Sequence, residues 1–216
     1  MALKLYMHPL SSFCHKALVA LYENDTPFQP HIVDLGNAEA RAEFLKVWPI
    51  GKFPVLRDDA RDRTVPESTI IIEYLAQHYP GRTALVPPDE DLARQTRLRD
   101  RFFDLYVHLP MQRIVGERLR PEGSKDPFGL EQARAQLATS LGMIEADMAS
   151  KAWAMGDHFT MADCAAAPAL FYANKVMPLA GTYKYVASYL QRLLERPSYA
   201  RVIHEAQPYF HLFPVE

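Results

Sequence analysis

The stretch LKLYMHPLSSFCHKALVALYEN, residues 3–24, decides how the chain begins to fold. Residues 3–7 form a short apolar run that stops at the turn signal His8-Pro9, and this pattern predicts a buried strand. The pair Ser11-Ser12 then offers hydroxyl caps for a helix whose apolar residues share one face as far as about Asn24. The chain therefore opens with a strand, a tight turn and a helix.

The segments up to residue 80 complete a small α/β domain. A strand, a helix and a second strand, with Pro30 indicating an edge position, are predicted to form a βαβ unit with a right-handed crossover. Two short strands and a helix follow. The predicted segments after the first helix are residues 28–33, 38–47, 53–56 and 64–65 and a helix that begins at Glu67-Ser68 and ends at Tyr79.

The composition changes after this point. Pro80-Gly81 and Pro87-Pro88 bracket a stretch that cannot continue a helix, so residues 81–90 are predicted to be a linker. Strand signals then disappear, and an all-α second domain is predicted over residues 91–216. Its helices are expected at residues 92–119, 130–148, 162–174, 183–194 and 198–207.

Composition and charge exclude several classes of protein. The chain has 216 residues, of which 49% are hydrophobic and 23% charged, as in an ordinary soluble domain protein. Its net charge of −2 predicts neither nucleic acid nor an anionic membrane as a partner. The N-terminus lacks the apolar run of a signal peptide, and Cys14 and Cys164 are far apart in the sequence, so we expect a cytoplasmic protein.

The first turn suggests a site for a thiolate. A helix N-terminus presents unpaired N–H groups and a partial positive charge, which stabilise an anion and lower the pKa of a thiol. Residues 11–14 read S-x-x-C where a dithiol redox protein has C-x-x-C, so a dithiol cycle within the chain is excluded. A serine hydroxyl here can still stabilise a thiolate that comes from another molecule. The simpler alternative is that Ser11 and Ser12 only cap the helix and that Cys14 is a buried apolar residue.

Two further segments combine a proline with groups that suit a peptide-like ligand. In Gly51-Lys52-Phe53-Pro54, a cis proline at the head of a strand would leave the Phe53 backbone free to pair with an extended ligand. In Pro66-Glu67-Ser68, the hydroxyl and N–H groups of Ser68 at a helix start suit a carboxylate. The alternatives are an edge-strand proline without a ligand and an ordinary cap. In the helical domain, Thr160 and Asp163 have the spacing of a capping box, which we assign to stability.

Taken together, these segments resemble the cytosolic glutathione transferase family along essentially the whole chain. The resemblance is carried by Leu10 to Cys14, Gly51 to Leu56, Glu67-Ser68, the Pro-rich linker and the Thr160–Asp163 box. It implies an α/β thioredoxin-like N-terminal domain, an all-α helical C-terminal domain and a homodimer. The sequence looks most like the serine-type, theta- and zeta-like members, in a bacterial-looking form.

The resemblance also implies roles for individual residues. Ser11 matches the catalytic serine that hydrogen-bonds the glutathione sulfur, and Phe53 would pair with the cysteinyl unit. Glu67 and Ser68 would hold the γ-glutamyl end, and Lys52 would lie near the glycyl carboxylate. Theta-like members often have a histidine in the second helix, whereas this chain has Ala38-Glu39-Ala40-Arg41, so Arg41 is a substitute candidate.

We therefore predict a detoxifying glutathione S-transferase in which Ser11 activates the thiol of glutathione, the co-substrate, and no metal takes part. The thiolate would attack a small hydrophobic electrophile in a cleft between the domains. Candidate lining residues, each of which could equally be ordinary helix packing, are Leu10, Phe13, Phe102, Phe103, Tyr106 and Met111. Asp100 or Asp104 could reach a ligand of a dimer partner or lie on a solvated helix face.

Other functions remain open at this stage. The nine glycines form no dinucleotide or P-loop motif, and the eight histidines make no zinc signature. A glutathione-dependent isomerase or dehalogenase of the same fold would use the same site. A transferase-like binding module without turnover is a further alternative, and a thiol transferase that uses Cys14 is another.

Overall fold

The structure is a computed structural model that describes residues 2–214, and its N-terminal part is an α/β unit. Each predicted strand and helix of this part is present, with ends within a few residues of those expected. The elements are β1 (Leu3–Met7), α1 (Ser12–Glu23), β2 (Gln29–Ile32), α2 (Ala38–Val47), β3 (Val55–Asp58), β4 (Arg63–Pro66) and α3 (Ser68–His78).

The four strands form one sheet in the order β2-β1-β3-β4. Strand β1 pairs in parallel with β2 and antiparallel with β3, and β3 pairs antiparallel with β4. Strand β2 is therefore an edge strand, as Pro30 indicated. An edge strand pairs on one side only, so it tolerates a proline, which has no backbone N–H to donate.

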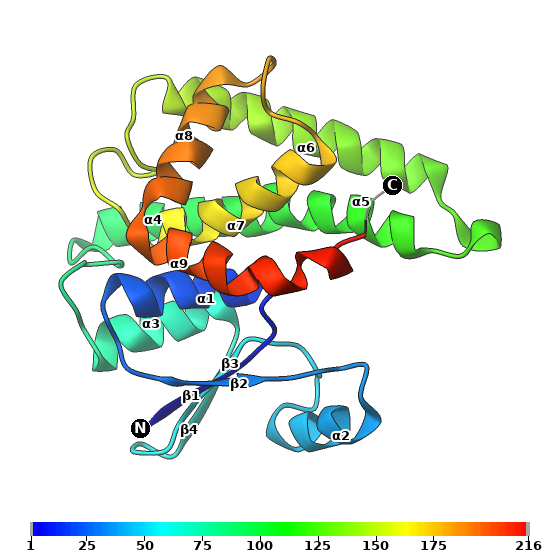
Figure 1. The fold of residues 1–216 in the computed structure, drawn as a ribbon. Coiled ribbons are helices and arrows are strands. Elements are labelled where there is room, and N and C mark those ends of the chain that lie inside the picture. The colour runs from blue at the N-terminus through cyan, green and yellow to red at the C-terminus, as the bar shows by residue number, and fades with distance from the viewer. Residues whose placement is uncertain (1, 215–216) are drawn as a thin grey trace.

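Alternation along β1 gives the sheet two apolar faces. Leu3, Leu5 and Met7 are buried in the main core together with residues of α1 and α3. Tyr6 points to the other face and packs in a smaller cluster that includes Phe44 of α2. In Figure 1, α1 and α3 lie between the sheet and the C-terminal helices, whereas α2 lies on the side away from them.

The C-terminal part, as far as the structure describes it, consists of helices joined by loops. It contains α4 (Glu90–Phe102), a π-helical turn η1 (Phe103–His108), α5 (Leu109–Leu119), a short 3-10 turn η2 (Glu122–Ser124), α6 (Pro127–Met148), α7 (Met161–Val176), α8 (Lys184–Glu195), α9 (Pro197–Ala206) and a 3-10 segment η3 (Gln207–Leu212). The predicted helix at residues 92–119 is thus divided by η1. Repetition of apolar residues does not reveal such a turn because it shifts the pattern by a single residue.

Helix α1 joins the two parts of the molecule. It packs against α3 on the sheet side and against α7 and α9 on the helical side. Nearly all of its residues are buried, which fits the continuous apolar run at positions 17–21. Within residues 2–214, no helix has both the length and the apolar character needed to span a membrane.

Candidate functional site

Three chain segments meet at one end of the sheet, and they carry the residues that the sequence singled out. The register pairs Tyr6 with Val55 and Val55 with Pro66. The chain just after β1, just before β3 and just after β4 therefore lies side by side. These segments hold Ser11, Phe53 and Glu67-Ser68 respectively, which explains how residues far apart in the sequence reach one edge.

Ser11 is the N-cap of α1 and is half-buried. Its Oγ accepts a hydrogen bond from the backbone N–H of Cys14 at 3.3 Å, and its own N–H donates to the His8 carbonyl at 2.9 Å. Since the hydroxyl oxygen is the acceptor in the capping bond, the hydroxyl hydrogen remains available to donate. The cap therefore does not exclude a role in binding an anion.

The neighbouring segments have the backbone features that the sequence suggested. The Phe53–Pro54 peptide bond is cis, and Phe53 lies ahead of Val55, the first paired residue of β3. Glu67 has a φ of 69°, in the left-handed region that favours glycine. An unfavourable φ of this kind in a non-glycine residue is often kept at a functional site.

The remaining predicted binding residues differ in exposure. Ser68 is the first residue of α3 and is buried, so a helix N-terminus faces the same end of the sheet as that of α1. Glu67 and Lys52 are exposed, as is Arg41 on α2. None of these three exposed residues lines the groove that contains Ser11. Their roles in binding a ligand therefore stay predictions.

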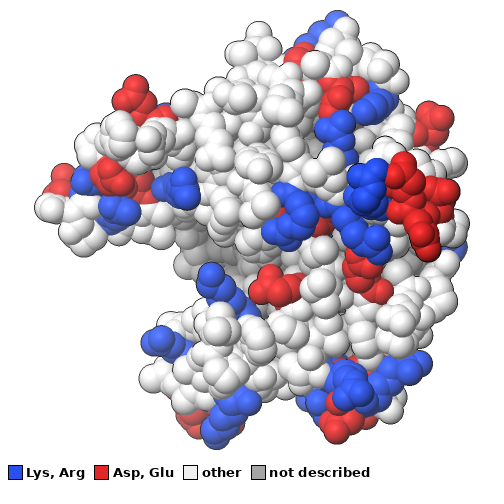
Figure 2. Space-filling model, turned by 180° about the vertical axis from the view of Figure 1, so that it is seen from behind, with Lys and Arg blue, Asp and Glu red and all other residues white. Residues whose placement is uncertain are grey.

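A groove of about 450 Å³ lies between the two parts of the molecule, with Ser11 in its wall. Figure 2 shows the molecule hollowed between the side that carries α2 and the end of the α5–α6 pair. The N-terminal wall consists of residues 10–12 and Phe53, and the other wall is mostly apolar. The full lining is Leu10, Ser11, Ser12, Phe53, Met111, Gln112, Val115, Gly116, Leu119, Tyr172, Leu212, Phe213 and Pro214.

The expected lining of this groove was partly wrong. Leu10 and Met111 do line it, but the other four aromatic candidates do not. Phe13 stacks on His108 instead, and Phe103 is buried in the core. The residues that replace them come from α5, from Tyr172 of α7 and from the C-terminal segment that begins with Leu212 at the end of η3. Helical periodicity alone does not tell which face of α5 meets the groove.

Sequence reasoning also missed the partner of Ser12. The Ser12 Oγ lies 2.7 Å from Nε2 of His108, at the end of the π-helical turn. Burial is the main cause that lowers the pKa of His108 to about 3, and the nearby Lys16 and His15 lower it further. His108 is therefore uncharged at neutral pH. The two residues are 96 positions apart, so no local pattern could have paired them.

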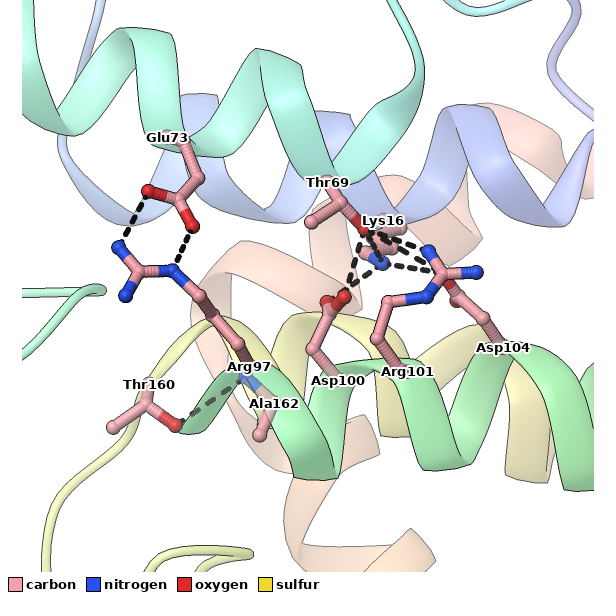
Figure 3. Close-up of polar contacts among 9 residues, drawn as sticks. All are labelled: Lys16, Thr69, Glu73, Arg97, Asp100, Arg101, Asp104, Thr160 and Ala162. Carbon is pink, nitrogen blue, oxygen red and sulfur yellow. Dashed lines mark hydrogen bonds and ion pairs between the residues drawn. The ribbon is translucent and has the colours of Figure 1, made fainter. Parts of the chain in front are cut away.

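Asp100 and Asp104, the two candidates for contact with a dimer partner's ligand, are buried in a charge cluster with Lys16. The Lys16 Nζ lies 2.6 Å from Asp100 Oδ1 and 2.8 Å from both Asp104 Oδ2 and Thr69 Oγ1. Figure 3 shows these side chains converging from α1, α3, α4 and η1, with Arg101 beside Asp104. The solvated-face interpretation is wrong for both aspartates because they are almost fully buried. Desolvation raises the pKa of Asp100, although the nearby Lys16 opposes this effect.

Cys14 does not have the properties of a reactive thiol. Its side chain is fully buried, and burial raises its pKa to about 12, although the hydrogen bond with Ser11 opposes this effect. A thiolate at Cys14 is therefore unfavourable at neutral pH. Both cysteines of the chain are free and buried.

Among residues 2–214, no group of three or more His, Cys, Asp or Glu side chains is arranged to hold a metal ion. The groove instead offers the hydroxyl groups of Ser11 and Ser12 and the N-terminus of α1, which suit an anionic ligand. Such an arrangement can bind and stabilise a thiolate or a carboxylate.

Comparison with known proteins connects both parts of the chain to one family. Residues 5–83 match the glutathione S-transferase N-terminal domain, and residues 127–192 match the glutathione S-transferase C-terminal domain. Together these two matches cover most of the chain.

Individual relatives are distant but align along nearly the whole length. Glutathione S-transferase 3 of Zea mays is 29% identical over 208 residues, which cover 93% of each chain. A stringent starvation protein A homolog of Histophilus somni is 23% identical, over 94% of this chain and 91% of the relative. The crystal structure of a Methylobacillus flagellatus glutathione S-transferase with glutathione bound has a TM-score of 0.85 at 24% identity, over 93% of this chain and 98% of that one.

Proposed function

The chain belongs to the cytosolic glutathione S-transferase family, and from this premise we propose that it activates the thiol of glutathione at Ser11 and conjugates it to small hydrophobic electrophiles. The observation that carries the proposal is the groove itself. Ser11 and Phe53 lie in one wall, and the apolar side chains of α5 and of the C-terminal segment lie opposite. A polar and an apolar reactant can thus meet there.

The chemistry requires little of the protein. The hydroxyl of Ser11 donates a hydrogen bond to the sulfur, and the N-terminus of α1 adds a partial positive charge. The thiol proton leaves to solvent, and the thiolate attacks the electrophile. A hydrogen bond to an anion contributes about 1.5 to 3 kcal/mol, which corresponds to one or two pKa units of the thiol.

Binding of the tripeptide would use the other predicted residues. The Phe53 backbone, which lies ahead of the paired part of β3, would bind the cysteinyl unit. Glu67 and Ser68, at the start of α3, would hold the γ-glutamyl end, and Lys52 would lie near the glycyl carboxylate. The support is the strand register, which brings these segments beside the end of β1.

The substitution Ser11→Ala tests the proposal. We expect it to lose most turnover, by about 10- to 100-fold in kcat, because the lost hydrogen bond acts on the thiolate, with glutathione affinity changed only a few fold. The matched control is Ser150→Ala, an exposed serine after α6. A Ser11→Ala enzyme as fast as wild type with several electrophiles would remove Ser11 as the activating group.

A homodimer is part of the proposal. Apolar side chains remain exposed along α3, α4 and η1, where a second copy of the chain could cover them. Examples are Ile70 at 52% exposed and Leu98 at 64% exposed, with Leu105 and Tyr106 further along the same helical stretch. Light scattering should give twice the chain mass, and Leu98→Glu should lower it. A monomeric wild type would contradict this part.

The buried free cysteines suit the cytoplasmic location that we also propose.

A binding module without useful turnover is a second candidate. The observation that favours it is the match to a stringent starvation protein A homolog, a relative that is not named as a transferase. Thermal denaturation with and without millimolar glutathione discriminates between the two. A bound ligand raises the melting temperature by mass action, so no rise supports a module that does not use glutathione, whereas a rise together with turnover of an electrophile supports the transferase.

A further inference from the structure

Ser12 lies in the wall of the groove next to Ser11, but its hydroxyl has a different partner. Its Oγ is 2.7 Å from Nε2 of His108, whose side chain is 1% exposed. Phe13 stacks on the imidazole with ring centroids 4.1 Å apart and an interplanar angle of 11°. The stacking and the burial fix the ring, and the ring in turn fixes the Ser12 hydroxyl.

The direction of this bond assigns Ser12 to one side of the groove. His108 ends η1, and α5 follows at once, with Met111, Gln112 and Val115 in the opposite wall. The Ser12 Oγ is therefore directed at the helical part of the molecule, which also supplies the groove wall opposite Ser11 and Phe53, where the electrophile would lie. Ser11 caps α1 and would face the sulfur.

Few other polar groups of the groove can donate to an electrophile. The hydroxyl of Tyr172 already donates to the Leu10 carbonyl at 2.8 Å. The amide of Gln112 is on an exposed residue, where water competes for its hydrogen bonds. Ser12 is 7% exposed, so its hydroxyl combines low exposure with a fixed orientation.

Two states of the neutral imidazole are possible, and they have different consequences. With its proton on Nδ1, His108 would accept the Ser12 hydrogen and leave only lone pairs for the groove. With its proton on Nε2, His108 donates to Ser12 Oγ, and the hydroxyl hydrogen is free. Burial beside Lys16 disfavours a charged imidazole, so His108 is also a weak base, which argues against Ser12 as a nucleophile.

We propose that Ser12, held by Nε2–H of His108, donates a hydrogen bond to the carbonyl oxygen of the electrophile, and that the enzyme is therefore suited to α,β-unsaturated carbonyl compounds. Ser12 would be a catalytic residue and His108 a positioning residue. The inference rests on the proposed function because it needs a glutathione thiolate in the same groove.

The addition balances without another reactant. The sulfur forms a bond to the β-carbon, the C=C π pair shifts between the α-carbon and the carbonyl carbon, and the carbonyl π pair moves onto oxygen. Ser12 stabilises the resulting enolate oxygen. The α-carbon then takes one proton from solvent, equal to the proton that the thiol released, so there is no leaving group and no oxidation.

The test compares two electrophiles in the full-length protein. trans-2-Nonenal has a conjugated carbonyl, whereas benzyl chloride reacts by displacement and has no acceptor oxygen. Removal of a donor to a developing oxyanion lowers rates by about 10²- to 10³-fold in the strongest cases, so we expect Ser12→Ala to lower kcat/KM for the enal by about 10- to 100-fold. The loss for benzyl chloride should be about tenfold smaller, since no charged oxygen forms.

Variants of His108 separate positioning from packing. His108→Phe keeps an aromatic ring against Phe13 but no N–H, and it should lose the preference for the enal as Ser12→Ala does. His108→Gln offers an amide N–H and should restore most of it. His158→Phe, on an exposed loop, is the matched control. If His108→Phe does not fold, Ser12→Thr, which keeps the hydroxyl, should retain the preference that Ser12→Ala loses.

The thiolate absorbance of bound glutathione, titrated against pH, distinguishes the possible failures. Ser11→Ala should raise the pKa of the bound thiol, and Ser12→Ala should not. Equal losses for both electrophiles, or a raised thiol pKa in Ser12→Ala, would overturn the assignment of Ser12 to the electrophile. If wild type binds no thiolate and conjugates neither compound, the proposed function itself fails.

Discussion

Ser11 and Ser12 are adjacent and chemically identical, but the structure gives them different partners. Ser11 accepts a backbone N–H as a helix cap, and Ser12 is paired with a neutral, buried histidine. The first partner is local and could be predicted from the position of a serine at a helix start. The second depends on a contact between α1 and η1, two elements far apart in the chain, so no local pattern indicates it. This difference is the basis for proposing that Ser11, and not Ser12, faces the sulfur.

Lys16 shows how strongly one residue can be tied to the fold. Its side chain is 1% exposed, and its ammonium group lies between two buried carboxylates. We expect Lys16→Met to lower the free energy of unfolding by about 3–5 kcal/mol, because it leaves Asp100 and Asp104 without their buried counter-charge. Urea denaturation measures the change.

The control for Lys16 is Lys46→Met. Lys46 forms an ion pair with Glu43 on the surface of α2, with both side chains more than half exposed. Exposed pairs contribute little, so the urea midpoint should hardly move. Equal effects of the two substitutions would mean that the buried cluster does not stabilise the fold.

The fold should lose stability in acid because two of its histidines are buried in the uncharged form. Burial lowers the pKa of His15 to about 4, and burial together with Lys16 lowers that of His108 to about 3, from 6.5 in the unfolded chain. Below pH 6.5 the unfolded chain binds protons that the folded protein does not, so stability falls as pH falls. The slope approaches about 1.4 kcal/mol per pH unit for each histidine.

Urea midpoints at a series of pH values between 7 and about 4.5 check this prediction, in a range above most carboxyl titrations. The raised pKa values of Asp100 and Asp163 act in the opposite direction at the acidic end. The decisive quantity is therefore the difference between wild type and His108→Phe, whose slope should be smaller by about one proton. Parallel slopes would contradict the neutral state of His108 in the fold.

At the scale of elements, the capping box of α7 is a predicted feature that the structure contains. Thr160 caps the helix, and Asp163 accepts the Thr160 N–H at 2.9 Å. Asp163 also accepts from the Ala154 N–H at 2.8 Å and from the Tyr189 hydroxyl at 2.5 Å. The box therefore fixes the preceding loop and α8 as well as the start of α7.

Substitutions in the capping box of α7 should destabilise the fold to different degrees. Thr160→Ala removes one capping oxygen and should cost about 1 kcal/mol, while Asp163→Ala leaves several buried donors unpaired and should cost more than about 2 kcal/mol. Asp89→Ala, at the exposed N-cap of α4, is the matched control with a typical cap effect. Calorimetry gives the order, and an Asp163→Ala effect no larger than that of Asp89→Ala would contradict the reasoning.

The positions of helices and strands were easier to predict from the sequence than the face that each helix turns toward its neighbours. The strands, the first cap and the helices of the second part follow from local periodicity, turn residues and caps, which act over a few positions. The π-helical turn before Leu109 and the side of α5 that meets the groove do not. Both depend on packing between distant helices, which is also why Phe13 was misplaced and the residues after η3 were missed.

At the scale of the whole molecule, a second polar contact holds the two parts together. Glu23, at the end of α1, pairs with Arg196 at 2.5 Å and accepts from Ser198 at 2.9 Å and from Thr83 at 3.0 Å. Burial alone would raise the pKa of Glu23, but these partners outweigh it and the pKa is lowered. With the Lys16 cluster, this contact secures α1 along its length.

The consequence of that arrangement concerns fragments of the protein. Ten of the twelve residues of α1 are buried, and the partners of many of them lie beyond residue 90. A fragment of residues 1–80 would expose the apolar face of α1 to water and leave Lys16 and Glu23 without most of their counter-ions. We expect such a fragment to precipitate or bind hydrophobic dyes when expressed alone. A well-dispersed NMR spectrum of the fragment would show instead that it folds without the helical part.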